Sequence, residues 1–136
     1  MLGDSEAQII DVSAHTQGHI LWYFAKDKAL LTGDTLFNLS IGGLFEGTPE
    51  QMFKALQKIK SLPDDVDFYP GHEYTLSGAN FAYYVNKENQ KIEKYIQDAI
   101  NKLKQGQPVP PVKLGLEKQC NPFLQANTLT EFKKLF

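Results

Sequence analysis

The fold class follows from residues 29–34, which read Ala-Leu-Leu-Thr-Gly-Asp. The first four residues form a short apolar run that is typical of a buried strand, and the Gly-Asp pair ends it. A second run, Ile20–Ala25, precedes it across the polar turn Lys26–Lys28, so the two runs predict a β-hairpin. Because both runs are nearly unbroken in apolar residues, they indicate a sheet covered on both faces.

Further elements extend this hairpin in both directions along the chain. Gln8–Val12 and Val66–Pro70 are short runs that predict two more strands. Thr48 is followed by a proline and then by Gln51, a pattern that predicts a helix with Thr48 as its N-cap. The glycine-rich residues 38–47 before it are expected to form a loop.

The character of the chain changes after Tyr74. Residues 77–104 carry apolar side chains at helical spacing and predict two helices separated near residues 86–89. The tail from Leu124 predicts a last short helix. We therefore predict an α/β (α+β) chain in two parts, strand-rich over residues 1–74 and helical over residues 75–136.

Composition excludes several classes of protein. The net charge of −2 offers no basic surface for nucleic acid, and no apolar run is long enough to span a membrane. The single cysteine, Cys120, cannot form an internal disulfide, which fits a cytoplasmic protein. No Gly-x-Ser-x-Gly motif is present to supply a serine nucleophile.

Candidate chemistry lies where the predicted strands begin or end. His19 comes just before a strand, whereas Asp34 and His72 follow strands, and each of the three directly follows a glycine. Imidazole and carboxylate groups are suitable ligands for zinc, so we expect these three side chains to converge on a metal site. The alternative interpretation is three unrelated polar residues. His15 is not predicted as a ligand, because Gly18 argues against a helix that would pair it with His19.

Five blocks of sequence occur in an order that resembles a known family. The blocks are His15–Ile20, Leu31–Phe37, Phe45–Met52, Gly71–Leu76 and Asn121–Leu124. Together they resemble glyoxalase II, the hydroxyacylglutathione hydrolases of the metallo-β-lactamase superfamily. The resemblance implies a four-layered αββα sandwich followed by a helical domain. Residues 1–74 would be the second half of that sandwich, and residues 75–136 the helical domain.

The resemblance also implies a site and a reaction. His19 and His72 would each bind one of two divalent metal ions, zinc first and iron or manganese as alternatives, and Asp34 would bridge them. Tyr74 would contact the thiol-bearing part of the substrate. The parent enzyme would hydrolyse S-2-hydroxyacylglutathione to glutathione and a 2-hydroxy acid, as in methylglyoxal detoxification. The metals would activate water, so no nucleophile from this chain is implied.

The sequence departs from the family pattern in two respects. A His-x-His-x-Asp-His motif that supplies further ligands is absent, so we expect a fragment or truncated product that is inactive alone and exposes an apolar sheet face open to self-association. In addition, the residues at the positions of the family's glutathione-binding side chains are uncharged. These are Gly43, Phe45, Gln125 and Asn127.

Two other functions stay open. The chain could be a non-catalytic half-protein that serves as an interaction or assembly module, which the missing ligand motif favours. It could also belong to another hydrolase with the metallo-β-lactamase fold, such as a lactonase. The helical tail with Asn121-Pro122-Phe123 argues against the lactonase. A small-molecule thioester stays the substrate that the resemblance implies.

Overall fold

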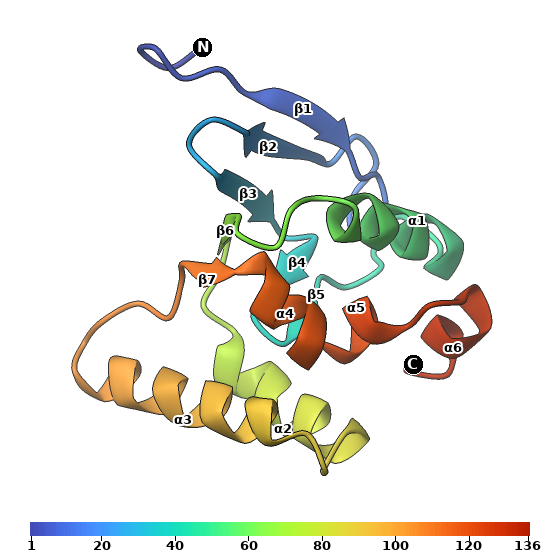
Figure 1. Ribbon diagram of the computed structural model, residues 1–136. Helices are drawn as coiled ribbons and strands as arrows, with labels where there is room; N and C mark the ends of the chain where they lie inside the picture. The colour runs from blue at the N-terminus through green and yellow to red at the C-terminus, as the bar shows by residue number, and fades with distance from the viewer.

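A five-stranded sheet forms the centre of the molecule in the computed structural model, which describes residues 1–136 (Figure 1). The strand order is β1-β2-β3-β6-β7, with β3 and β6 parallel and the other pairs antiparallel. The predicted hairpin is confirmed as β2 and β3, and the two other predicted strands as β1 and β6. The bounds are β1 Gln8–Asp11, β2 Ile20–Phe24, β3 Ala29–Gly33, β6 Asp67–Pro70 and β7 Val112–Lys113.

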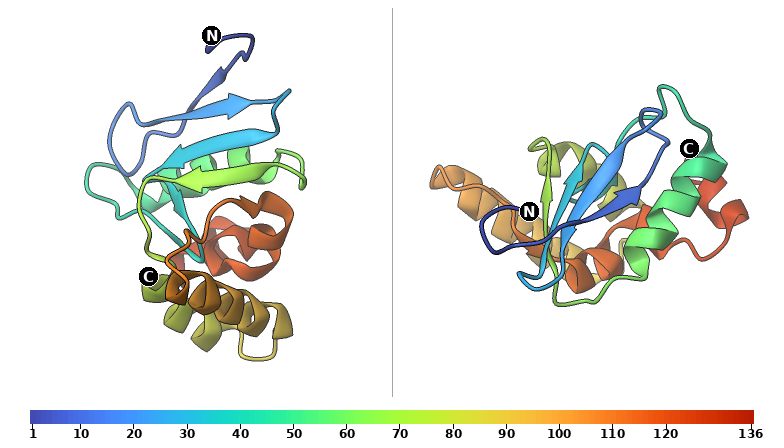
Figure 2. Two further views of the ribbon diagram at one scale, coloured as in Figure 1. Left: turned by 90° about the vertical axis from the view of Figure 1, so that its left-hand side faces the viewer. Right: turned by 90° about the horizontal axis from the view of Figure 1, so that it is seen from above.

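Helix α1, Pro49–Lys60, covers one face of this sheet (Figure 2). The predicted capping box is confirmed, since the Thr48 hydroxyl accepts from the Gln51 backbone N–H and the Gln51 side chain accepts from the Thr48 backbone N–H. The helix buries an apolar stripe that shares one cluster with the inward side chains of the strands. Its members include Met52, Leu56 and Ile59 from α1, and Leu21, Leu30 and Phe68 from the sheet.

The capping box gives a direct stability prediction. Thr48→Ala removes the acceptor for a helix N-terminal N–H, so we expect a loss of about 1 kcal/mol in the free energy of unfolding. Urea unfolding followed by circular dichroism measures the loss. Thr130→Ala is the matched control, because Thr130 is exposed and caps nothing, and it should change stability by less than about 0.5 kcal/mol. Equal effects of the two substitutions would contradict the assigned cap.

The opposite face of the sheet carries no helix (Figure 2). A row of apolar side chains crosses it from strand to strand, because each residue pairs in register with the next. The row and its exposed fractions are Ile9 51%, Trp22 45%, Leu31 41% and Tyr69 38%. The expectation of a sheet covered on both faces is therefore wrong for this chain, since none of its own elements lies over these side chains. The expectation of an exposed apolar face is confirmed.

A small hairpin lies within the region expected to be a loop. Strands β4, Leu36–Phe37, and β5, Ser40–Ile41, pair with each other across a turn at Asn38 and Leu39. Leu39 adopts a φ of +64°, which is uncommon for a residue with a branched side chain. Strands of two residues leave no periodic pattern, which is why the sequence did not predict them.

The helical part begins directly after Tyr74. The two predicted helices and the break between them are confirmed as α2 and α3, and the short helix in the tail as α6. Strand β7 and the short helices α4 and α5 were not predicted. The bounds are α2 Thr75–Val85, α3 Gln90–Lys104, α4 Leu114–Cys120, α5 Pro122–Gln125 and α6 Leu129–Lys133. None of these helices has the length and apolarity needed to cross a membrane.

Two apolar clusters organise the molecule. The larger one lies between the sheet, α1, α5 and α6, and the smaller one lies between α2, α3, α4 and Leu39. The larger cluster takes residues from both sides of Tyr74, among them Phe68 and Phe132. The division into domains at residues 74 and 75 stays a prediction.

Candidate active site

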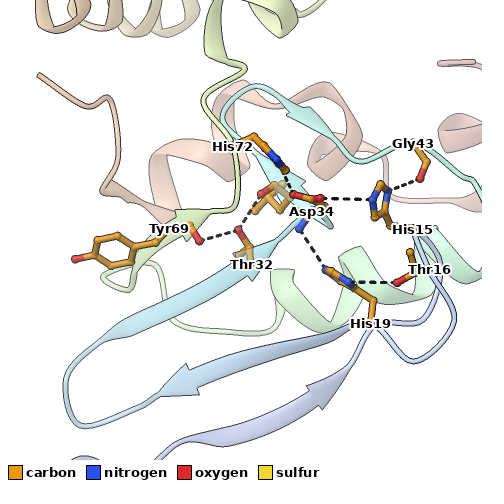
Figure 3. Close-up of polar contacts among 9 residues, drawn as sticks. His15, Thr16, His19, Thr32, Asp34, Gly43, Tyr69 and His72 are labelled. Carbon is orange, nitrogen blue, oxygen red and sulfur yellow. Dashed lines mark hydrogen bonds and ion pairs between the residues drawn. The ribbon is translucent and has the colours of Figure 1, made fainter. Parts of the chain in front are cut away.

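The topology of the sheet explains why the candidate residues meet. Strands β3 and β6 are parallel, so Asp34 and His72, which follow them, lie at the same edge of the sheet. Strand β2 is antiparallel to β3, so the residue just before it, His19, lies at that edge too. The structure brings all three predicted residues together there (Figure 3). Their role as metal ligands stays a prediction.

The Asp34 carboxylate is the centre of the group. Its Oδ1 lies 2.7 Å from Nδ1 of His72, and its Oδ2 lies 3.6 Å from Nε2 of His15. The side chain is 28% exposed, so solvent or a ligand can reach it. A carboxylate flanked by two imidazoles is a suitable environment for a divalent cation.

His19 is held with one nitrogen toward the site. Its Nε2 lies 3.2 Å from the Asp34 backbone nitrogen, and its Nδ1 lies 3.4 Å from Oγ1 of Thr16. Because a backbone N–H only donates, Nε2 is the acceptor, and the neutral ring carries its proton on Nδ1. Burial, followed by the nearby His15, lowers the pKa of His19 below its usual value. The ring is therefore kept neutral, and its Nε2 lone pair, which accepts from the Asp34 N–H here, is the donor that a metal would take.

Two glycines provide the space in which these side chains meet. Gly33 has a φ of +51°, and a Cβ there would lie 2.8 Å from Nε2 of His19. A Cβ at Gly71 would lie 2.7 Å from Oδ1 of Asp34. Real Cβ atoms do not approach polar atoms so closely, so any side chain at either position would displace a candidate ligand. The glycines that precede Asp34 and His72 are thus part of the site.

His15, which was not predicted to be a ligand, lies beside the group as well. Its Nδ1 lies 2.7 Å from the Gly43 carbonyl oxygen, and its Nε2 faces Asp34. The absence of a helix between His15 and His19 is as expected, but a tight turn brings both rings to the same edge, with centroids 5.8 Å apart. The signal in the sequence was two histidines four positions apart with a glycine between them, which a turn brings together without a helix.

A cavity of about 590 Å³ opens beside this group. Tyr74 forms part of its wall and stacks on His72, with ring centroids 5.1 Å apart and planes 6° apart. Gly43 also lines the cavity, whereas Gln125 and Asn127 do not. The apolar and aromatic part of the wall consists of Phe37, Ile41, Phe45, Tyr74, Phe81 and Phe123.

These residues do not form a complete metal cage by themselves. No group of three or more His, Cys, Asp or Glu side chains in the chain is arranged to hold a metal ion. The donor types nevertheless fit a divalent cation, and the two glycines keep the donors in contact. A full ligand set would need additional side chains beside Asp34.

The two parts of the chain match the models of two known protein families. Residues 1–72 match the family model described as "Metallo-beta-lactamase superfamily", and residues 73–134 match "Hydroxyacylglutathione hydrolase C-terminus". The chain belongs to the metallo-β-lactamase superfamily. The resemblance to glyoxalase II that the sequence predicted is confirmed, since the model of residues 73–134 and the curated relatives carry the name hydroxyacylglutathione hydrolase.

Individual relatives of this superfamily member are named hydroxyacylglutathione hydrolases. It is 43% identical over 125 residues to a hydroxyacylglutathione hydrolase of Ruegeria pomeroyi, covering 92% of this chain and 49% of the relative. It is 41% identical to the hydroxyacylglutathione hydrolase of Psychromonas ingrahamii, covering 98% and 51%. The chain thus spans about half the length of the curated relatives it matches.

Solved structures of the superfamily share the fold. A metallo-β-lactamase from Staphylococcus aureus aligns with a TM-score of 0.66 at 24% identity, over 100% of this chain and 35% of that one. A protein solved in a di-iron-bound form aligns with a TM-score of 0.57 at 25% identity, over 87% and 42%. The α+β fold expected from the sequence is therefore confirmed as a metallo-β-lactamase fold.

Proposed function

We propose that this chain supplies one half of the catalytic centre of a metal-dependent thioester hydrolase. The observation that carries the proposal is the contact of Asp34 with His72, His15 and His19 at one edge of the sheet, beside a cavity large enough for a substrate. The curated relatives are named hydroxyacylglutathione hydrolases. Hydrolysis would form a C–O bond between water and the acyl carbon, break the C–S bond and pass a proton to the departing sulfur.

Three residues of the chain would hold the metals. His19 would bind through Nε2, Asp34 through its carboxylate and His72 through its imidazole, with two divalent ions, zinc first, as the proposed cofactors. When bound, such ions polarise a carbonyl and lower the pKa of water. Other contacts within the chain orient these ligands. The Thr16 hydroxyl orients the ring of His19, and the Asp34 carboxylate orients the ring of His72.

The remaining wall would hold the substrate. Tyr74 stacks on His72, and Phe37 meets the Tyr74 ring edge-on at 5.0 Å, so the aromatic wall begins directly beside the reacting end. A thioester placed along this wall would have its carbonyl near Asp34 and His72. Apolar side chains around it would displace water other than the water that reacts.

A second candidate function rests on the exposed apolar row on the sheet. Trp22 and Leu31 lie at its centre, and such a face favours association with another protein surface. The chain could then act as an assembly module without turnover.

Reconstitution from two halves distinguishes these functions. We expect the chain alone to hydrolyse S-lactoylglutathione no faster than free zinc does. Mixing it with the first half of the Ruegeria pomeroyi hydrolase, in the presence of zinc, is expected to restore turnover of a lactoyl thioester, either S-lactoylglutathione or the neutral S-lactoyl-N-acetylcysteamine. The control is the second half of the Ruegeria enzyme mixed with its own first half. Turnover in that control, but none with this chain on either thioester, would contradict the proposal and favour the assembly module.

A further inference from the structure

The cavity beside Asp34 has no cationic group in its wall. Apart from His15, Asp34 and His72 at one end, its lining consists of aromatic, aliphatic, serine and glycine residues. All 14 basic residues of the chain are lysines, and none of them lines the cavity. The chain contains no arginine, the side chain best suited to bind a carboxylate through two hydrogen bonds.

The two uncharged residues in the tail do not compensate for this. Gln125 donates its side-chain amide to the Gln119 carbonyl oxygen at 2.8 Å, and Asn127 accepts from Nζ of Lys60 at 3.3 Å. Both side chains are thus engaged away from the cavity. A carboxylate brought into the aromatic part of the cavity would lose its water without gaining a charged partner, which is strongly unfavourable.

The mouth of the cavity is apolar as well. Phe45 is 79% exposed and stands edge-on against His15, with ring centroids 5.1 Å apart. Phe81 and Phe123 stack deeper in the wall at 5.5 Å. An exposed phenylalanine beside a cavity with further aromatic rings in its wall forms a surface that an apolar ligand covers.

We propose that the thiol carrier accepted by this cavity is uncharged and apolar or aromatic, in contrast to a carrier such as glutathione with two carboxylates. The proposal rests on the proposed function, because it names the substrate class of the same site. The aromatic wall holds the carrier by burial of apolar surface, and the two serines, Ser40 and Ser77, offer neutral hydrogen bonds to it.

Binding to the purified chain tests the proposal without requiring turnover. The probes are S-benzylglutathione and S-benzyl-N-acetylcysteamine, which carry the same benzyl thioether on a charged and on a neutral carrier. We expect the neutral probe to bind at least about tenfold more tightly, since each unpaired carboxylate forfeits a charge-assisted hydrogen bond. Isothermal titration calorimetry gives the two Kd values, and amide NMR shifts at Gly43 and Gly78 locate the ligand.

Two variants sharpen the test. Phe45→Ala should weaken the neutral probe several-fold, and because Phe45 is exposed the fold should tolerate it. Gly43→Lys should tighten S-benzylglutathione, since a Cβ at Gly43 meets only the Phe45 ring, at 3.2 Å, and that ring is free to move. Gln107→Lys, which adds the same charge in the exposed loop after α3, is the matched control and should change neither Kd.

The outcomes separate this proposal from the proposed function. Equal or tighter binding of S-benzylglutathione to the unmodified chain overturns the uncharged carrier, and so does a failure of both probes to bind. Selective binding of the neutral probe supports it. If the neutral probe binds but the reconstituted enzyme hydrolyses no thioester, the uncharged ligand stands and the thioesterase function fails.

Discussion

Asp34→Asn is expected to reduce thioester hydrolysis by the reconstituted enzyme about 10³-fold or more. The substitution keeps the size of the side chain and removes its charge, so the donor set loses the group that contacts both His72 and His15. Stabilisation of transition-state charge by a bound metal is worth several kcal/mol, and each 1.36 kcal/mol changes a rate tenfold. Steady-state kinetics gives the loss, which should appear in kcat/KM.

The control for Asp34 is another aspartate changed in the same way. Asp65 is exposed, pairs with Lys28 at 2.7 Å and lies outside the cavity, so Asp65→Asn should leave turnover unchanged. Zinc titration of each variant gives a second readout that does not depend on turnover, and only Asp34→Asn should weaken metal binding. Full activity and unchanged zinc affinity in folded Asp34→Asn would show that Asp34 is not a ligand.

The parts of the fold that the sequence predicted are those determined by local physics. The hairpin of β2 and β3 follows from two apolar runs around a polar turn, and α1 follows from the capping box at Thr48. The break between α2 and α3 follows from loss of helical spacing near Asn89, whose side chain caps α3. None of these requires a contact from elsewhere in the chain.

The parts that the sequence did not predict depend on distant contacts. The hairpin of β4 and β5 is held by Asn121, whose side-chain amide donates to the Ser40 carbonyl oxygen at 3.1 Å across 81 positions of sequence. Strand β7 has two residues and exists because it pairs with β6. His15 reaches Asp34 because the chain turns between His15 and His19. Apolar runs on β2 and β3 predicted burial of both faces, but a run cannot show which elements cover it.

Substitution of the buried carboxylate Glu117 is expected to cause a large loss in the free energy of unfolding. Glu117 lies on α4 with none of its surface exposed. Its Oε1 accepts from the Leu39 N–H at 2.5 Å and from Nδ2 of Asn121 at 2.9 Å, and its Oε2 accepts from the Tyr95 hydroxyl at 2.6 Å. The carboxyl therefore fixes the turn at Leu39, where the backbone has a positive φ.

This turn connects the helical part to the cavity. Leu39 lies between β4 and β5, and those strands place Phe37, Ser40 and Ile41 in the cavity wall. Glu117→Ala would leave three buried donors without their acceptor, at about 1–3 kcal/mol each. We expect a loss of at least about 3 kcal/mol in the free energy of unfolding, together with weaker ligand binding in whatever fraction remains folded.

Glu117→Gln separates the charge of this residue from its hydrogen bonds. Burial raises the pKa of Glu117 from 4.5 to about 7, because the ionised form loses its water. The folded pKa is above the unfolded one, so the stabilisation is fully present below pH 4.5 and is lost as pH rises through about 7. The difference between these two pKa values corresponds to a loss on the order of 3 kcal/mol in the free energy of unfolding. Glutamine cannot ionise, and its amide can accept from Leu39 and donate to the Tyr95 oxygen.

We therefore expect the stability of the unmodified chain relative to Glu117→Gln to fall between about pH 4.5 and pH 7 and to change little above that. Urea unfolding of both proteins at several pH values measures this difference. Every other ionisable group is present in both proteins, so its contribution to the difference cancels. Tyr95 and Cys120, the titratable neighbours of Glu117, have raised pKa values and stay neutral throughout. A constant difference across the pH range would mean that the Glu117 carboxyl keeps one protonation state, with its three donors sufficient to hold it ionised inside the protein.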